Sequence, residues 1–191
     1  MKNLDHIKYW EGRYSSGGNS GEGSYHKDAE AKANYINNVI TQYNIKTIND
    51  FGHGDGNQLT YFSDFNKYYG YDVSSTARAR CISQFTDVNK YQFIDHPSKF
   101  IKSDLALSLD VIYHIINLKD YEEYLKILFS IGKYVLIYAV DHDEETGGCA
   151  HILTRKFSSY IKDQFPSFEL IDSQNIIRDS VSMYLYKEKN L

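Results

Sequence analysis

The chain has 191 residues, a formal net charge of −4 and a sequence pI of about 6.0. The length predicts a single domain, residues 1–191, with a substantial core, and the weak negative charge argues against a large nucleic-acid-binding surface, although it leaves room for a local basic groove. Two distant cysteines, Cys81 and Cys149, favour free thiols over a disulfide framework or a zinc site, and the lack of a signal peptide or a membrane-length apolar run predicts a soluble, cytoplasmic protein.

Residues 1–25 combine aromatic side chains with a run rich in glycine and serine. Residues 9–14 read Tyr-Trp-Glu-Gly-Arg-Tyr, and the run that follows, up to Tyr25, cannot hold regular structure. A linker is one interpretation, but we expect no second domain before it, and the only tryptophan, Trp10, lies beside it. We therefore favour a lid or a loop that contacts a cofactor.

A helix and a strand lead into a glycine-rich turn. Apolar residues recur at three- and four-residue spacing over residues 27–43, which predicts an amphipathic helix against a sheet, and residues 47–51 are typical of a strand. The turn holds glycines at three alternate positions, Gly52, Gly54 and Gly56. Glycine allows positive φ and the close approach of a ligand to the backbone, so this turn is a candidate binding loop.

The region after the turn favours an adenosine-containing ligand. A helix is expected over residues 57–62, with its free N–H groups aimed at an anionic or polar ligand. A second strand, residues 68–71, ends in Asp72, whose carboxylate could accept two hydrogen bonds from a ribose diol. The glycine spacing is Gly-x-Gly-x-Gly rather than the Gly-x-Gly-x-x-Gly of a dinucleotide site, which favours another adenosine cofactor.

A third helix and a third strand follow. The run Ser74–Thr76 caps the helix, and the short strand over residues 91–94 leads to Asp95 before Pro97 stops regular structure. The expected core residues of the helix are Ala77, Cys81, Ile82 and Phe85.

A near-continuous apolar run over residues 105–109 predicts a buried parallel strand. Leu109 and Asp110 then lie at its C-terminal end, where open α/β sheets bind ligands. Asp110 could instead cap the next turn, and His114 could be a packed histidine, so both alternatives stay open.

The rest of the chain continues the alternation of helices and strands. The predicted elements are a helix over residues 120–131, a strand over 134–140, a helix over 158–164 and a hairpin of strands over 168–171 and 181–186. An acidic loop, Asp141-His142-Asp143-Glu144-Glu145, follows the fifth strand. Acids and a histidine could bind a divalent ion, but we favour a solvated loop and expect no metal.

Three segments resemble class I S-adenosylmethionine (SAM)-dependent methyltransferases. Residues 50–59, Asp-Phe-Gly-His-Gly-Asp-Gly-Asn-Gln-Leu, resemble motif I of that family, and residues 107–114, Leu-Ser-Leu-Asp-Val-Ile-Tyr-His, resemble motif IV. Residues 10–14, Trp-x-x-Arg-Tyr, resemble the N-terminal segment of small, thiopurine-methyltransferase-like members. The resemblance covers nearly the whole chain and implies a Rossmann-like α/β fold, with a seven-stranded, mostly parallel sheet and helices on both faces.

The same resemblance implies SAM as the cofactor. Arg13 could pair with the SAM carboxylate through its guanidinium, and Asp95 could contact the adenine amino group, although a surface turn is as well supported. His53 stands where motif I often has a small residue or Cys, and we expect it to face the loop. The implied cofactor-binding residues are Trp10, Arg13, Tyr14, Asp50, Gly52, His53, Gly54, Gly56, Gln58, Asp72, Val73, Asp95, Leu109 and Asp110.

Methyl transfer requires alignment of donor and acceptor, and an oxygen acceptor is also helped by a base. Histidine is the usual base near neutral pH. The candidates are His142 and His151, ahead of His114, which we expect to be structural. An amine acceptor could need no base.

The motifs do not specify the acceptor. Because we see no large insertion, we expect a small or medium acceptor, with a sugar hydroxyl in glycan modification as the first choice by analogy. One alternative is a nucleic-acid or cap methyltransferase, which would need a basic groove. Another is a non-catalytic SAM-binding module that supports a partner. The oligomeric state stays open.

Overall fold

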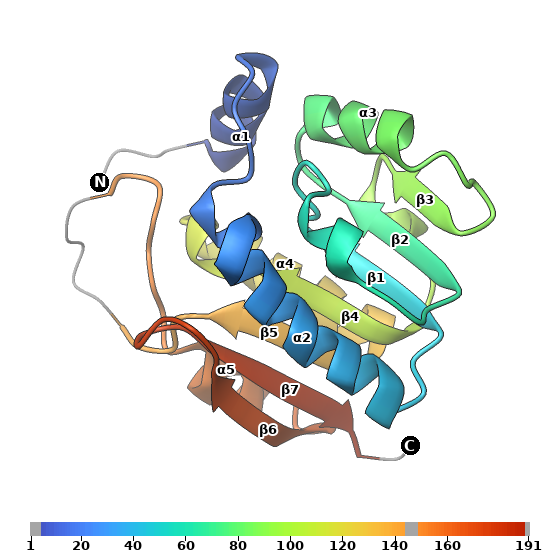
Figure 1. The fold of residues 1–191 in the computed structure, drawn as a ribbon. Coiled ribbons are helices and arrows are strands. Elements are labelled where there is room, and N and C mark those ends of the chain that lie inside the picture. The colour runs from blue at the N-terminus through green and yellow to red at the C-terminus, as the bar shows by residue number, and fades with distance from the viewer. Residues whose placement is uncertain (1–4, 144–148, 190–191) are drawn as a thin grey trace.

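A seven-stranded sheet organises the chain in the computed structural model, which describes residues 5–143 and 149–189. The strand order is β3-β2-β1-β4-β5-β7-β6, and β7 alone runs in the direction opposite to the other strands (Figure 1). The strands are β1 (Thr47–Phe51), β2 (Lys67–Tyr71), β3 (Tyr91–Ile94), β4 (Ser103–Leu109), β5 (Gly132–Ala139), β6 (Phe168–Asn175) and β7 (Ser182–Glu188). The predicted mostly parallel, Rossmann-like sheet is confirmed.

Helices cover both faces of this sheet (Figure 1). The α-helices are α1 (His6–Ser15), α2 (His26–Gln42), α3 (Ser75–Gln84), α4 (Leu118–Ile131) and α5 (Phe157–Gln164). In Figure 1, α2 crosses in front of the sheet, α4 and α5 lie behind it, and α1 stands beside α3 at one end. Over the described part of the chain, none of the helices has the length and apolarity needed to span a bilayer.

Two apolar layers hold the helices on the sheet. Successive strand side chains point to opposite faces, so each central strand feeds both layers. On one face, Ile36 and Ile40 of α2 pack in a cluster with Leu136 of β5. On the other, Leu125 and Leu128 of α4 pack with neighbouring residues of the same strands. Because all of these side chains are almost fully buried, the layers fix the strand ends that carry the site.

Two local predictions were wrong. No α-helix follows the glycine turn, because a single 3₁₀ turn, Gln58–Tyr61, occupies that stretch before the chain returns to the sheet. The N–H of Asn66 already donates to Lys46 O, which leaves no room for a full helix. Ile82 of α3 is 54% exposed rather than buried, because only the face of α3 that carries Ala77 and Cys81 turns inward.

One helix was not predicted. α1 begins after Asp5, whose side chain accepts a hydrogen bond from the backbone N–H of Lys8, as an N-cap residue does. Its only fully buried residue is Tyr14, so the helix has almost no apolar stripe for a periodicity search to detect.

Candidate functional site

A cavity of about 560 Å³ opens at the C-terminal ends of β1, β2 and β4. This volume lies within the roughly 300–1,000 Å³ typical of small-molecule sites. The position is the point where the strand order reverses between β1 and β4, which is where open α/β sheets bind ligands. Residues of α1 and of the segment 20–24 line one side of the cavity. We term α1 and residues 16–25 together the roof.

Gly54 marks the place where the glycine turn meets the roof. Its φ is +59°, and a Cβ at this position would collide with Ser20 Oγ and lie 2.9 Å from Tyr14 OH. Any side chain here would therefore push the roof away. Gly52 also lines the cavity, whereas Gly56 does not, because a Cβ at Gly56 would face Cys81 and Phe85 of the α3 region, 2.8 Å away.

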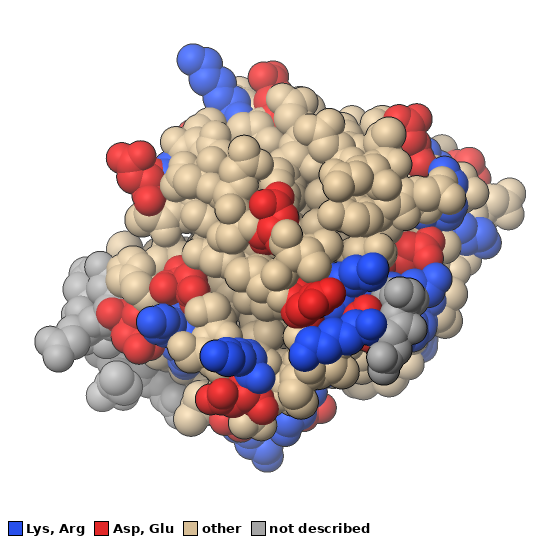
Figure 2. All heavy atoms as spheres, turned by 90° about the horizontal axis from the view of Figure 1, so that it is seen from below, with Lys and Arg blue, Asp and Glu red and all other residues tan. Residues whose placement is uncertain are grey.

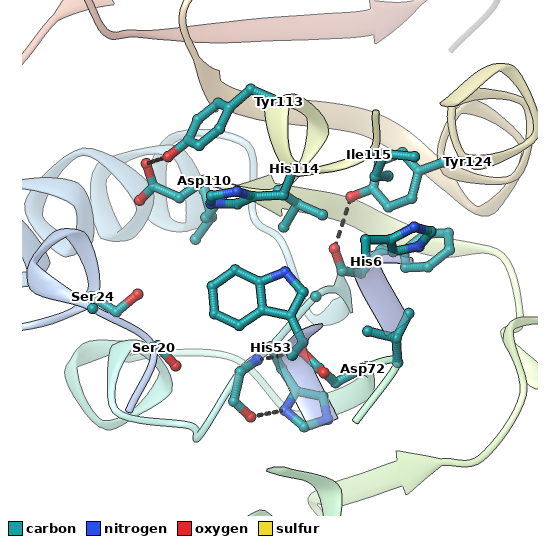
Figure 3. A pocket seen from close by; sticks show the side chains of 18 of the residues that line it. His6, Ser20, Ser24, His53, Asp72, Asp110, Tyr113, His114, Ile115 and Tyr124 are labelled. Atoms are coloured by element: carbon teal, nitrogen blue, oxygen red, sulfur yellow. Dashed lines mark hydrogen bonds between the residues drawn. The ribbon is translucent and has the colours of Figure 1, made fainter. Parts of the chain in front are cut away.

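Asp72 is held by the backbone on both sides. Its Oδ2 accepts a hydrogen bond from the N–H of Gly54 at 2.9 Å, and its Oδ1 accepts one from the N–H of Ser74 at 2.8 Å. Each carboxylate oxygen can accept a further bond. Asp72 therefore presents two fixed oxygens with remaining acceptor capacity to the cavity, on the side opposite His114 (Figure 3).

Asp50 and Gln58 supply further acceptors at the wall. Tyr68 OH donates to Asp50 Oδ2 at 2.7 Å. Burial raises the pKa of the Asp50 carboxyl to about 7, against the opposing effect of this hydrogen bond, and the nearby charge of Asp72 raises it further. Gln58 Nε2 donates to Ala29 O at 3.0 Å, while the buried Gln58 Oε1 accepts no hydrogen bond from the described residues. A cationic donor bound in the cavity would stabilise the ionised form of Asp50 and could donate a hydrogen bond to Gln58 Oε1.

Asp110 lies at the end of β4 in a buried ion pair. Its φ is +60°, and its Oδ2 lies 2.6 Å from Nζ of Lys32, which is fully buried in α2. Tyr113 OH donates to Asp110 Oδ1 at 2.7 Å (Figure 3). Both oxygens of Asp110 are thus engaged by the protein, so the residue fixes one wall of the cavity.

The roof is clasped to the glycine turn through Asp55. The N–H of Ser20 donates to Asp55 Oδ2 at 2.9 Å, and Ser20 Oγ accepts from the N–H of Asp55 at 2.9 Å. Tyr25 OH donates to the same Oδ2 at 2.8 Å. Sequence reasoning missed this role, although an acid between two turn glycines, facing a serine-rich run, was a signal that could have indicated it.

Aromatic rings close the cavity beside β4. Trp10 meets the ring of His114 edge-on, with centroids 5.0 Å apart, and His114 stacks on His151 at 5.4 Å. His151 in turn stacks on Tyr9 of α1 at 4.8 Å. The roof and the region after β5 therefore meet through these rings.

His114 has a defined tautomer. Its Nδ1 lies 3.0 Å from the carbonyl oxygen of His151, and because a carbonyl can only accept, Nδ1 carries the proton and Nε2 a lone pair. Burial lowers the pKa of His114 to about 4, against a smaller opposing effect of that hydrogen bond. The ring is neutral near pH 7, with Nε2 free of hydrogen bonds to the described residues.

No protein-family model matches the sequence, and no curated protein matches it significantly. Many solved structures share its fold. The N-methyltransferase NodS from Bradyrhizobium japonicum WM9, solved with S-adenosyl-L-homocysteine (SAH), is 9% identical, with a TM-score of 0.72 over 97% of this chain and 99% of that one. Magnesium protoporphyrin IX methyltransferase from Synechocystis PCC 6803, solved with SAM, is 13% identical, with a TM-score of 0.70 over 98% and 99%. The 16S rRNA methylase RmtB is 17% identical, with a TM-score of 0.59 over 96% and 74%.

The chain has the class I SAM-dependent methyltransferase fold. In this methyltransferase fold, most of the predicted site residues meet at one cavity. Those that line it are Trp10, Arg13, Tyr14, Asp50, Gly52, His53, Gly54, Gln58, Asp72, Val73, Leu109, Asp110, His114 and His151.

Of the two alternatives for Asp95, an adenine contact or a surface turn, the structure shows the surface turn, and the ring of His53 does not face the loop as expected. Asp95 lies outside the cavity, half exposed, in an ion pair with Lys99 at 2.6 Å, because the turn after β3 directs it to the surface. The ring of His53 packs edge-on against Phe93 behind the turn, and its Nδ1 lies 2.7 Å from Gly54 O. The ring therefore packs behind the turn, although His53 is one of the residues that line the cavity.

The acidic loop of the methyltransferase fold lies apart from the cavity. His142 is exposed and does not line it. The side chains of Asp141 and Asp143 accept hydrogen bonds from the N–H groups of Ser158 and Lys156, at the start of α5. Glu144 and Glu145 lie outside the described residues. Within the described ranges, no group of three or more His, Cys, Asp or Glu side chains is arranged to hold a metal.

Proposed function

We propose that this chain is a SAM-dependent methyltransferase in which one domain, with its N-terminal segment as a roof, encloses the cofactor. The observation that carries the proposal is the cavity of about 560 Å³ between the glycine turn and the roof, with the two oxygens of Asp72 fixed on its wall. A turn that only connected two secondary-structure elements would not require a cavity of this size beside a fixed carboxylate.

The residues around the cavity fit SAM. Asp72 can accept hydrogen bonds from a ribose diol, and Asp50 with Gln58 Oε1 can accept those of an ammonium group. Arg13 lines the cavity, and its Nε and one terminal N–H group donate to Asn19, at 2.6 and 3.5 Å. The other N–H groups of the guanidinium can donate to a carboxylate. When bound, SAM supplies a methyl group on a sulfonium, which is activated for transfer.

The acceptor in this proposal is a hydroxyl group on a small molecule, and a sugar hydroxyl in glycan modification remains our first choice. The cavity of about 560 Å³ has the size of a small-molecule site, which favours a small acceptor. His114 Nε2 carries a lone pair on the cavity wall, so it can take the proton from a hydroxyl acceptor. His142 is exposed outside the cavity and His151 contributes its carbonyl and its ring, so His114 replaces both as the favoured base.

A nucleic-acid acceptor is the second candidate, because one structural relative is an rRNA methylase. The charge of the chain does not favour it. On the face shown in Figure 2, basic and acidic side chains are intermingled rather than gathered by sign. Ion pairs such as Lys102–Glu188 and Lys133–Asp104 neutralise several of the lysines. A phosphate backbone is usually bound by an excess of basic groups.

Calorimetric titration with SAM and SAH tests whether the chain binds the proposed cofactor. We expect both to bind with one site per chain. Absence of binding by correctly folded protein would contradict the methyltransferase assignment.

A radiolabelled methyl-transfer screen across sugars, nucleotides and RNA then tests the acceptor. Transfer to RNA alone would overturn the proposal that the acceptor is a hydroxyl group on a small molecule. Binding without any transfer would favour a non-catalytic SAM-binding module.

Replacing His114 with asparagine is expected to lower kcat by about 10²–10⁴-fold with the best acceptor, because no base would then accept the proton of the acceptor hydroxyl. SAH affinity should change little. Since the neutral ring is the active form, kcat should stay level from about pH 8 to about pH 5 and fall as the pH drops through the His114 pKa of about 4. His142→Asn, on the exposed loop, is the matched control and should retain full kcat. Equal kcat in both variants would remove His114 from the mechanism.

A further inference from the structure

We propose that Glu11 is a positioning residue that latches α1 over the cavity and, through Ser74, holds the carboxylate of Asp72 in place. The part that concerns cofactor affinity rests on the proposed function, because it takes Asp72 as the ribose-binding acid. The latch itself is a property of the fold.

Glu11 bridges two helices that are far apart in the sequence. It lies in the middle of α1, and its Oε2 accepts hydrogen bonds from Ser74 Oγ at 2.7 Å and from the N–H of Thr76 at 3.2 Å. Its Oε1 accepts from Thr76 Oγ1 at 2.5 Å. These donors stand at the first turn of α3, where unpaired N–H groups and the helix dipole favour a negative charge. The contact therefore suits a carboxylate better than a neutral side chain.

Ser74 transmits this contact to the cavity. Its hydroxyl donates to Glu11 and accepts from the N–H of Ala77 at 3.1 Å, so its rotamer is fixed from both sides. Its backbone N–H donates to Asp72 Oδ1, and Asp72 Oδ2 receives the N–H of Gly54. A continuous chain of hydrogen bonds thus runs from the roof, through the α3 cap and Asp72, to the glycine turn.

Arg80 makes a second clasp between the same two helices. Its guanidinium donates to Gly18 O at 2.7 Å and to Tyr14 O, near the C-terminal end of α1. Carbonyl groups at a helix C-terminus favour a positive charge. The negative Glu11 of α1 thus contacts the N-terminal end of α3, and the positive Arg80 of α3 contacts the C-terminal end of α1. Both contacts agree in sign with the helix dipoles.

This arrangement links closure of the roof to occupancy of the site. A ligand bound to Asp72 stabilises the position of Ser74 and so stabilises the Glu11 contact. By thermodynamic reciprocity, the Glu11 contact strengthens ligand binding by the same factor. With the latch removed, α1 opens more readily and bound ligand escapes faster.

The single tryptophan gives a direct reading of the latch. Trp10 precedes Glu11 and packs against the rings of Tyr14 and His114 in the closed roof. In ligand-free Glu11→Ala, we expect the Trp10 emission to shift to longer wavelength and acrylamide quenching to increase. For SAH, we expect the dissociation constant to rise about tenfold, mainly through the dissociation rate. Glu11→Gln keeps one carbonyl oxygen and the side-chain shape, so it should recover part of both effects.

Lys8→Ala is the matched control, because Lys8 lies on α1, is highly exposed and pairs only with Asp5 among the described residues. It should behave as the wild type in every measurement, and circular dichroism checks that all variants fold. Wild-type emission, quenching and SAH dissociation rate in Glu11→Ala would overturn the latch. If the wild-type protein bound no SAH, the proposed function would fail, while the ligand-free fluorescence would still decide whether Glu11 holds the roof.

Discussion

Replacing Asp72 with alanine is expected to weaken the binding of SAM and SAH by about a hundredfold or more. In the proposed function, the substitution removes two charge-assisted hydrogen bonds from Asp72 to the ribose, each worth about 1.5–3 kcal/mol. It also frees the N–H groups of Gly54 and Ser74, which Asp72 now orders. Calorimetric titration measures the affinity, and thermal unfolding separates this effect from a loss of fold.

Asp95 provides the matched control for this prediction. Both acids follow neighbouring parallel strands, β2 and β3, but only Asp72 lines the cavity. Asp95→Ala should therefore leave SAH affinity unchanged, because it removes only surface ion pairs, with Lys99 and Arg78. Unchanged affinity in Asp72→Ala, or an equal loss in both variants, would show that the ribose is not bound by Asp72.

Replacing Lys32 with methionine is expected to lower the free energy of unfolding by about 3 kcal/mol. Lys32 is fully buried, with its Nζ 2.6 Å from Asp110 and 5.2 Å from the centre of the Tyr138 ring. Removing one partner of such a pair leaves the other charge poorly solvated, at a cost of roughly 3–5 kcal/mol. The lower end applies because the Asp110 side chain is 20% exposed and keeps the hydrogen bond from Tyr113. Urea denaturation measures the change.

Lys27→Met tests whether charge alone explains the loss, because Lys27 lies on the same helix but is exposed. It should change the free energy of unfolding by less than about 0.5 kcal/mol. The double variant Lys32→Met/Asp110→Asn should recover part of the stability, since no unpaired carboxylate remains. If Lys32→Met were as stable as Lys27→Met, the ion pair would contribute nothing to the fold.

The sequence by itself determined the sheet and the part of the site formed by the glycine turn and Asp72. Apolar runs of strand length mark β4 and β5 because strand formation and burial are properties of short segments. Gly52, Gly54 and Asp72 could be placed together because the C-terminal ends of parallel strands meet at one edge of a sheet. The same logic failed for Asp95, since the turn after an edge strand has no packing partner that directs its side chain inward.

The sequence predicted a lid in residues 1–25, but only the tertiary structure showed which contacts hold it and where each candidate histidine lies. Glu11 and Arg80 meet their partners across more than sixty residues of chain, and no local pattern encodes which side chains of two distant segments come together. His114 and His142 look alike in sequence, yet one is packed beside Trp10 and the other is exposed. Periodicity reports how a segment is buried, whereas these contacts depend on how separate segments pack, and that information exists only once the chain has folded.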